Sequence, residues 1–134
     1  MHAAYDYAVI RVVPRVEREE FVNVGVIVSC PPKDFLEARI ELDEQRLLSL
    51  DPQVNLDVVR AHLASIPLIC AGGPDAGPIG QLPRRERFHW LVAPRSTIIQ
   101  VSPVHTGRCT DFDATLERLL NVMVRQSGAA AAPP

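Results

Sequence analysis

The segment YDYAVIRVVPRVEREEFVNVGVIVSC, residues 5–30, decides the fold. Both of its arms are rich in Val, Ile, Tyr and Phe, and Pro14 with the charged run 15–20 separates them. Branched and aromatic residues favour extended strands, whereas a proline followed by polar residues favours a loop. The segment therefore predicts a β-hairpin that nucleates an antiparallel sheet.

Alternation along the two arms predicts how the hairpin pairs. Successive side chains of a strand point to opposite faces, so the even-numbered apolar residues share one face. These residues are Ala8, Ile10, Val12, Val22, Val24, Val26 and Val28. A register that sets the two groups opposite each other places Arg11 across from Asn23 and Val9 across from Gly25, whereas a shift by one residue sets valines against polar groups. We therefore expect one wholly apolar face, with Arg11, Asn23 and Gly25 on the other.

The group Arg11, Asn23 and Gly25 has two interpretations. A guanidinium beside an amide and a bare backbone can bind an anion or a carboxylate, because Arg offers a planar fork of donors and Gly lets a ligand approach the main chain. Alternatively, the stem of Arg11 covers apolar neighbours, Asn23 or a carboxylate binds its head, and Gly25 marks a β-bulge. The residues alone leave both open.

Composition limits the classes of protein to consider. A chain of 134 residues, 47% of them hydrophobic, predicts a single domain over residues 1–126 and a disordered Ala/Pro tail over 127–134. The net charge of −2 gives no general attraction to nucleic acid or to an anionic membrane. No apolar run suits a membrane span and no signal peptide is evident, so we expect a cytoplasmic protein. Three widely spaced cysteines predict reduced thiols rather than a disulfide framework.

The middle of the chain predicts one strand and two helices. Residues 36–42 alternate between apolar and charged, which is typical of a strand with one wet face. Asp43 can cap a helical turn over residues 44–50. A longer helix is expected over residues 56–66, because its apolar residues form one stripe, and Pro67 should end or kink it.

The remainder predicts further elements in the order loop, helix, strand, loop, helix. They cover residues 71–80, 83–92, 97–103, 104–110 and 113–125. The first loop is rich in glycine but lacks the spacing of a phosphate-binding P-loop. The predicted architecture is α+β, an antiparallel sheet nucleated by the N-terminal hairpin with helices packed on one face.

Side chains that can bind a ligand concentrate between residues 84 and 108. Arginines with hydroxyls and one large aromatic residue suit phosphate or nucleotide recognition. The same residue types also form the hot spots of protein interfaces. Together with the hairpin group, the candidate ligand-binding or partner-binding residues are Arg11, Asn23, Gly25, Glu86, Arg87, Trp90, Arg95, Ser96 and His105.

A catalytic interpretation requires a nucleophile and a base within reach of each other. Ser96 or Cys109 with His105 and Glu86 is the combination that the sequence offers. One His-Cys pair four residues apart does not make a metal site, and we predict no metal and no cofactor. The sequence leaves open whether the chain is an enzyme.

Several blocks of sequence resemble the bacterial domain-of-unknown-function family 3037. The blocks are YDYAVIRVVPRVEREEFVNVGV from residue 5, GPIG from 77, ERF from 86, WL from 90, APRST from 93 and SPVHTG from 102. The resemblance covers residues 5–125 and implies a stand-alone cytoplasmic bacterial protein. Proteins of this kind are often encoded beside a kinase-like protein of the toxin type, which implies a kinase-like partner. The resemblance assigns no catalytic residue.

Two hypotheses for the function follow. The first is a non-catalytic interaction or regulatory module that binds a partner protein, kinase-like by the resemblance, through residues 84–108. The second is a small enzyme or binding protein for an anionic or phosphorylated compound, in which Arg11, Arg87 and Arg95 bind the anion and His105 or Glu86 acts as acid or base. Convergence of the hairpin group with Arg95 and His105 in one pocket would favour the second. A homodimer is compatible with either hypothesis.

Overall fold

The computed structural model describes residues 2–126, so Met1 and the predicted tail at 127–134 lie outside the described residues. The strands are β1 (Ala3–Val12), β2 (Val22–Cys30), β3 (Phe35–Ile40), β4 (Ile99–Val101) and β5 (His105–Cys109). The α-helices are α1 (Glu44–Leu50), α2 (Leu56–Ala71), α3 (Arg84–Val92) and α4 (Phe112–Met123). The predicted α+β class is confirmed, as is the antiparallel sheet that begins with the N-terminal hairpin.

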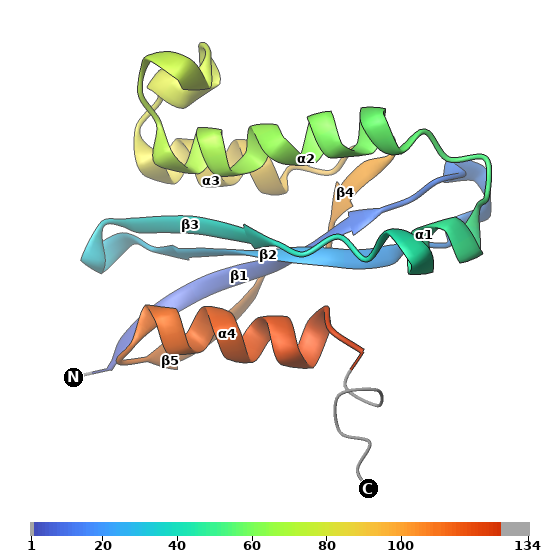
Figure 1. The fold of residues 1–134 in the computed structure, drawn as a ribbon. Helices are drawn as coiled ribbons and strands as arrows, with labels where there is room; N and C mark the ends of the chain where they lie inside the picture. Colours follow the sequence, from blue (N-terminus) through green and yellow to red (C-terminus); the bar gives the residue numbers. More distant parts are fainter. Residues whose placement is uncertain (1, 127–134) are drawn as a thin grey trace, which may run out of the picture.

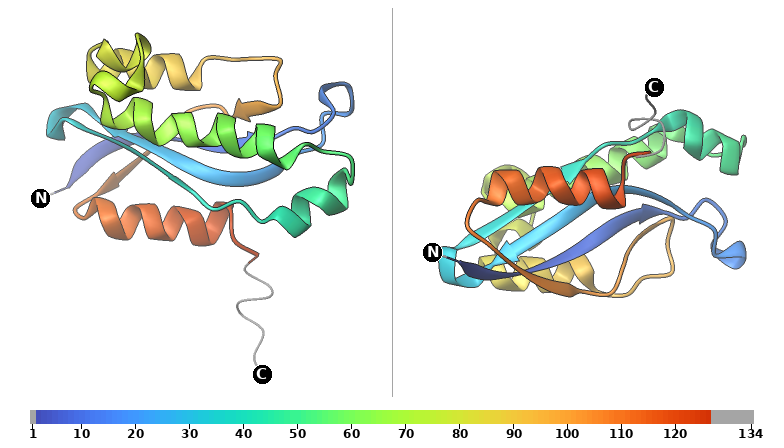
Figure 2. Two further views of the ribbon diagram at one scale, coloured as in Figure 1. Left: turned by 45° about the horizontal axis from the view of Figure 1, so that its top comes forward. Right: turned by 90° about the horizontal axis from the view of Figure 1, so that it is seen from below.

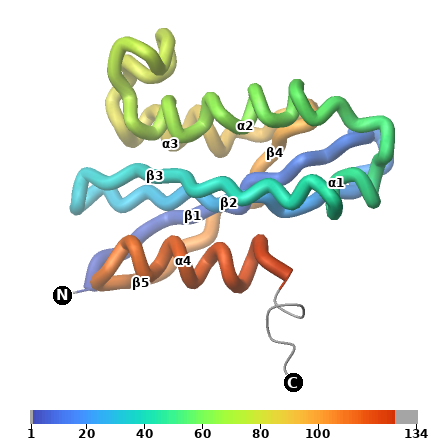
Figure 3. The backbone as a smooth tube through the Cα atoms, viewed as in Figure 1, coloured from blue at the N-terminus to red at the C-terminus, as the bar shows by residue number. Residues whose placement is uncertain are grey.

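The strands form one antiparallel sheet in the order β3-β2-β1-β4, and β5 pairs with the other half of β1 (Figure 3). Ser102 lies between β4 and β5 and keeps the edge of β1 paired. Its hydroxyl oxygen accepts from the N–H of Val9 at 2.8 Å, and its own N–H donates to the carbonyl of Val9 at 2.8 Å. Because β5 covers His105–Cys109, the prediction of a loop over residues 104–110 is wrong. The sequence HTGRC is poor in strand-forming residues, and pairing with β1 overrides that weak preference.

A β-bulge in β2 changes the predicted register. Arg11 pairs with Asn23 as predicted, but Gly25 pairs with Ile10 rather than with Val9. Val24 is the additional residue between these two pairs. A Cβ atom on Gly25 would lie 2.6 Å from the carbonyl oxygen of Arg39, so the bulge needs a glycine. The interpretation of Gly25 as a bulge residue is confirmed.

The bulge also reverses the alternation along β2. Val22 and Val24 belong to one core cluster, whereas Val26 and Val28 belong to the other. The prediction that these four valines share one face is therefore wrong, since the inserted residue moves all later side chains to the opposite face. Both faces of the sheet consequently present apolar residues.

Helices cover both faces of the sheet, so the prediction that they pack on one face needs correction. Figures 1 and 2 show α2 and α3 on one side of the sheet and α4 on the other. The buried residues of α2 and α3 pack with Ile10, Val12 and Val24. Leu116, Leu119, Leu120 and Val124 pack on the opposite face with Tyr5, Val26 and Val28. The molecule therefore has three layers: α2 with α3, the sheet, and α4. The layer formed by α4 is possible because the bulge makes the second face of the sheet apolar.

Helix α2 continues through Pro67 to Ala71, so of the two predicted effects of Pro67, an end or a kink, the end is excluded. Its start is capped by Asn55, whose side-chain oxygen accepts from the N–H of Val58 at 3.1 Å. A proline inside a helix removes one backbone hydrogen bond. Burial of residues on both sides of it, Leu63 and Ile69 among them, keeps the helix continuous.

Two further predictions concern cysteines and membranes. Cys30, Cys70 and Cys109 are free and buried, which agrees with the prediction of reduced thiols. Burial raises the pKa of Cys70 to about 12. Within residues 2–126, no helix has the length and apolar character that a membrane crossing requires.

Candidate functional site

Arg11 lies in the middle of three strands, at the end of β1 that is paired with β4. It pairs with Asn23 of β2 on one side and with Gln100 of β4 on the other. Its guanidinium carbon lies 4.1 Å from the ring centre of Phe21, in the geometry of a cation–π contact. The sheet therefore holds this cation among polar neighbours and over an aromatic ring.

Two polar atoms of this group are buried without a hydrogen-bond partner in the described part of the chain. They are Nε of Arg11 and Oδ1 of Asn23. The amide nitrogen of Asn23 is engaged, because it donates to the carbonyl of Met123 at 3.0 Å. A buried donor without an acceptor costs free energy, so Arg11 does not stabilise the sheet as a fully hydrogen-bonded arginine would.

A cavity of about 390 Å³ opens beside Arg11. Its lining residues are Arg11, Val13, Val16, Glu17, Glu19, Phe21, Arg95, Ser96 and Gln100. The structure thus brings together three of the residues predicted from sequence, namely Arg11, Arg95 and Ser96. Because two glutamates join the two arginines, the lining carries both signs of charge.

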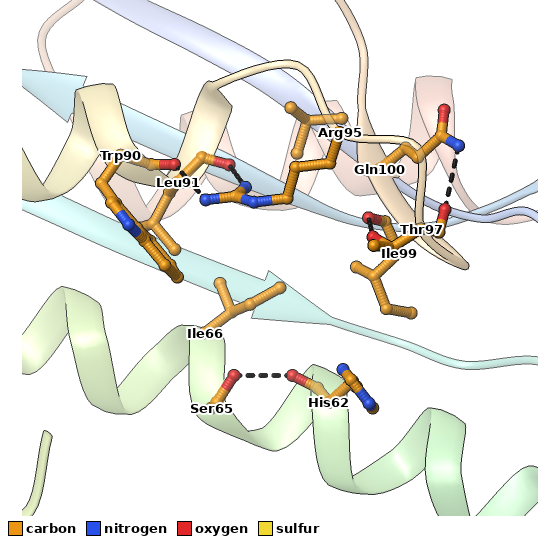
Figure 4. Close-up of a pocket in the computed structure, with 10 residues that line it drawn as sticks. His62, Ser65, Ile66, Trp90, Leu91, Arg95, Thr97, Ile99 and Gln100 are labelled. Carbon is orange, nitrogen blue, oxygen red and sulfur yellow. Dashed lines mark hydrogen bonds between the residues drawn. The ribbon is translucent and has the colours of Figure 1, made fainter. Parts of the chain in front are cut away.

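A second, smaller cavity of about 110 Å³ lies between α2 and the segment that connects α3 to β4. Figure 4 shows Trp90 and Arg95 on one side of it and His62 with Ser65 of α2 on the other. The guanidinium of Arg95 lies 4.2 Å from the ring centre of Trp90. It also donates to the carbonyl of Trp90 at 2.6 Å and to that of Leu91 at 3.2 Å.

These bonds fix Arg95 at the carboxyl end of α3. The last carbonyls of a helix lack partners within the helix and carry partial negative charge, which a cation stabilises. Arg95 is therefore a positioned cation, most of whose donors already bind the backbone. In contrast, no hydrogen bond or ion pair of the Arg11 side chain is present within residues 2–126.

The two cavities adjoin, because Arg95 and Gln100 line both of them. We call the surface formed by Arg11, Phe21, Trp90, Arg95 and Gln100 the β4 strip. It contains two exposed aromatic side chains, each stacked against an arginine.

Arg87 and Glu86 lie elsewhere on α3. Arg87 is buried, and its guanidinium donates to the carbonyls of Leu82 at 2.9 Å, Ile69 at 2.8 Å and Cys70 at 2.7 Å. It links the end of α2 to the start of α3. Glu86 is exposed and does not line either cavity of the β4 strip.

His105 lies at the other half of β1. It pairs with Tyr7, and the two rings are 5.4 Å apart. Tyr7 and Arg11 are four residues apart on one strand, or roughly 13 Å. His105 therefore does not join the cavity that Ser96 lines. Of the predicted combination, Ser96 or Cys109 with His105 and Glu86, the form with Ser96 is not assembled. Among the described residues, no three His, Cys, Asp or Glu side chains form a group that could hold a metal.

Several lining residues were not among those predicted from the sequence. Phe21 follows a charged loop and has no partner in the local sequence, yet the hairpin register brings it beside Arg11. Gln100 joins the site because β4 pairs with β1, and His62 because α2 crosses that region. The register of the hairpin is the signal that could have found Phe21. The other two depend on long-range packing.

The model of a family described as a protein of unknown function (DUF3037) matches residues 7–124. The chain belongs to the DUF3037 family. This match confirms the resemblance noted in the sequence, and the whole β4 strip lies within the matched range. No curated protein and no solved structure gives a significant match. Membership of the DUF3037 family brings no known activity to this chain, so its function has to be argued from the site.

Proposed function

We propose that the chain is a non-catalytic module that binds a partner protein through the β4 strip. The observation that supports this proposal is the pair of exposed aromatics, each stacked with an arginine. Phe21 is 44% exposed and Trp90 is 40% exposed. Tryptophan and arginine are enriched in the hot spots of protein interfaces, and aromatic residues in general are enriched in interfaces. Large exposed aromatics gain free energy when a partner covers them.

The charges around the strip define the kind of partner segment that would fit. Arg11 has no carboxylate partner within the described residues and lines a cavity that an acceptor could enter. Glu17 and Glu19 on the rim disfavour a polyanion such as nucleic acid. The strip therefore suits a protein segment with one carboxylate beside an apolar side chain. The carboxylate would bind Arg11, and the apolar group would cover Phe21 or Trp90.

The candidate partner is a kinase-like bacterial protein that acts with this chain in the cytoplasm. The support for this choice is membership of the DUF3037 family and the gene neighbourhood that the resemblance implies. Three free, buried cysteines suit a reducing compartment.

The proposal is tested by affinity capture from the native host. Wild type is compared with Arg11→Gln and Trp90→Ala, which change the strip without touching the cores. Val122→Ser is the matched control, because Val122 is 62% exposed on α4 and lines neither cavity of the strip. We expect wild type and control to retain a common partner and both strip variants to lose most of it. Equal capture by all four proteins would contradict the proposal.

A small anionic ligand in the 390 Å³ cavity is the second candidate, because Arg11 and Arg95 both line it and no hydrogen bond or ion pair of the Arg11 side chain is present within residues 2–126. A thermal-shift panel of nucleotides and phosphorylated metabolites tests it, because a ligand that binds the folded state raises the unfolding midpoint. A shift in wild type that disappears in Arg11→Gln would support this candidate. No shift with any compound of the panel would count against it.

A further inference from the structure

Strand β3 forms one edge of the sheet and, among the described residues, pairs with β2 alone. The N–H of Glu41 donates to the carbonyl of Val24 at 2.7 Å, so the backbone of odd-numbered residues points toward β2. Backbone groups of an edge strand alternate between the paired side and the free side. The N–H and C=O groups of Leu36, Ala38 and Ile40 therefore point away from the sheet.

The side chains on this edge are self-complementary. Glu37 and Arg39 flank Ala38 on the α4 side of the sheet, where Arg39 forms ion pairs with Glu37 and Asp113 of its own chain. In an antiparallel pair centred on Ala38, Glu37 of one copy would stand opposite Arg39 of the other. Charges usually protect an edge strand from pairing. Here the order Glu-Ala-Arg favours an identical strand, because each Glu37 then stands opposite an Arg39 of the other copy.

An apolar groove of about 360 Å³ runs beside the same edge on the α2 side. Its lining residues are Ile40, Leu42, Glu44, Arg60, Leu63, Ala64 and Pro67. In the centred register, Leu36 of a second copy stands opposite Ile40, at this groove. Ala64 and Pro67 are exposed, and Leu68 on the next position of α2 is 49% exposed. In the single chain, solvent therefore covers an apolar surface beside the edge strand β3.

We propose that the chain forms a homodimer in which two β3 edges pair antiparallel about Ala38 and the sheet continues from one copy into the other. Three features coincide at this edge and support a second copy as the occupant: free backbone groups, reciprocal Glu37–Arg39 charges and the adjoining apolar groove. β3 and β4 lie at opposite edges of the sheet. The dimer therefore leaves the β4 strip free, and the inference is independent of the proposed function.

Charge-reversal variants test this pairing through the mass measured by light scattering coupled to size exclusion. We expect wild type to have twice the mass of the chain. Glu37→Arg and Arg39→Glu each place like charges opposite one another, so each variant should be a monomer. The double variant Glu37→Arg with Arg39→Glu restores opposite pairs and should be a dimer again. An equimolar mixture of the two single variants should form a heterodimer for the same reason.

Ala64→Glu tests the groove independently of the charge variants. Ala64 lines the groove and is exposed in the single chain, and glutamate is a good helix former, so the variant should fold. A carboxylate in the groove should weaken the dimer at least tenfold, with circular dichroism unchanged. A monomeric wild type would overturn the proposal. So would a dimer that persists in both charge variants and in Ala64→Glu, or single variants that stay monomeric when mixed.

Discussion

Arg87 and the β4 strip show two opposite uses of arginine in one small fold. The guanidinium of Arg87 is buried and donates to three backbone carbonyls, so it joins the end of α2 to the start of α3. The guanidinium of Arg11 lies over Phe21 beside an open cavity, and its buried Nε has no acceptor in the described residues. The first arginine stabilises the fold, whereas the second is available to a partner.

The difference arises from what surrounds each side chain rather than from the side chains themselves. The end of α2 supplies two carbonyls to Arg87 that would otherwise lack partners. Arg11 instead projects from a sheet between two amide side chains, Asn23 and Gln100. A buried cation needs hydrogen-bond acceptors, and Arg87 has three of them, whereas the Arg11 side chain has none within residues 2–126. Substitution of Arg87 should therefore lower the free energy of unfolding, whereas substitution of Arg11 should weaken partner binding with little change in stability.

Replacement of Arg87 should have the largest effect on stability. Arg87→Met keeps the length of the side chain but removes every donor, so three carbonyls lose a charged partner. We expect a loss of about 3 kcal/mol in the free energy of unfolding, measured by urea denaturation. Arg87→Lys, which retains the charge with fewer donors, should lose less. A loss below about 1 kcal/mol for Arg87→Met would show that these hydrogen bonds do not stabilise the fold.

Replacement of Gly25, beside the β-bulge, should have the next largest effect on stability. In Gly25→Val the added side chain meets the carbonyl of Arg39 and the side chain of Ile40, so β3 must shift. Overpacking of this kind typically costs about 2 kcal/mol. Chemical denaturation of Gly25→Val and Gly25→Ala checks the expectation. Stability equal to wild type would mean that the bulge does not require glycine.

Arg11→Gln should change stability little, because the contact with Phe21 is partly exposed and the Nε of Arg11 has no partner to lose. Such a cation–π contact contributes about 0.5 kcal/mol, so we expect an unfolding midpoint close to that of wild type. Phe21→Ala is the companion variant for the same contact. A loss as large as that of Arg87→Met would break the comparison, since Arg11 would then be part of the framework.

The smallest effect concerns an exposed arginine with carboxylate partners. Nε of Arg125 donates to Glu41 at 2.7 Å, and this hydrogen bond lowers the pKa of Glu41. The folded state therefore gains stability above the ordinary pKa of glutamate, about 4.3, and loses that gain as the pH falls through the lower folded value. In Arg125→Gln, the free energy of unfolding should fall slightly less steeply as the pH decreases below the ordinary pKa of glutamate. An unchanged pH dependence would show that solvent screens the pair completely.

The hairpin was predictable because its information is local. Residues 5–30 give both strands, and parity gives the pairing of Arg11 with Asn23. The bulge at Gly25 was predicted only as one of two interpretations, because one inserted residue does not change the alternation of the residues before it. The bulge gives the sheet a second apolar face, which α4 covers. A hairpin register without a bulge does not predict this face.

The site was predictable only in part, for the same reason. The residue types of Arg11, Arg95 and Ser96 suggested a binding role, and the structure brings these three to one cavity. The sequence does not distinguish Arg87 from Arg95 or Arg11, since burial and carbonyl partners depend on how α2 meets α3. β5 was missed because HTGRC becomes a strand only through its pairing with β1.

The most direct test of the central claim is the dissociation constant between the captured partner and the purified chain, measured by isothermal titration calorimetry. We predict that Arg11→Gln weakens binding at least tenfold, or about 1.4 kcal/mol, with an unfolding midpoint close to that of wild type. Arg87→Lys and Val122→Ser, where folded, should bind as wild type does. Unchanged affinity in Arg11→Gln, or an equal loss in Val122→Ser, would contradict the assignment of the β4 strip.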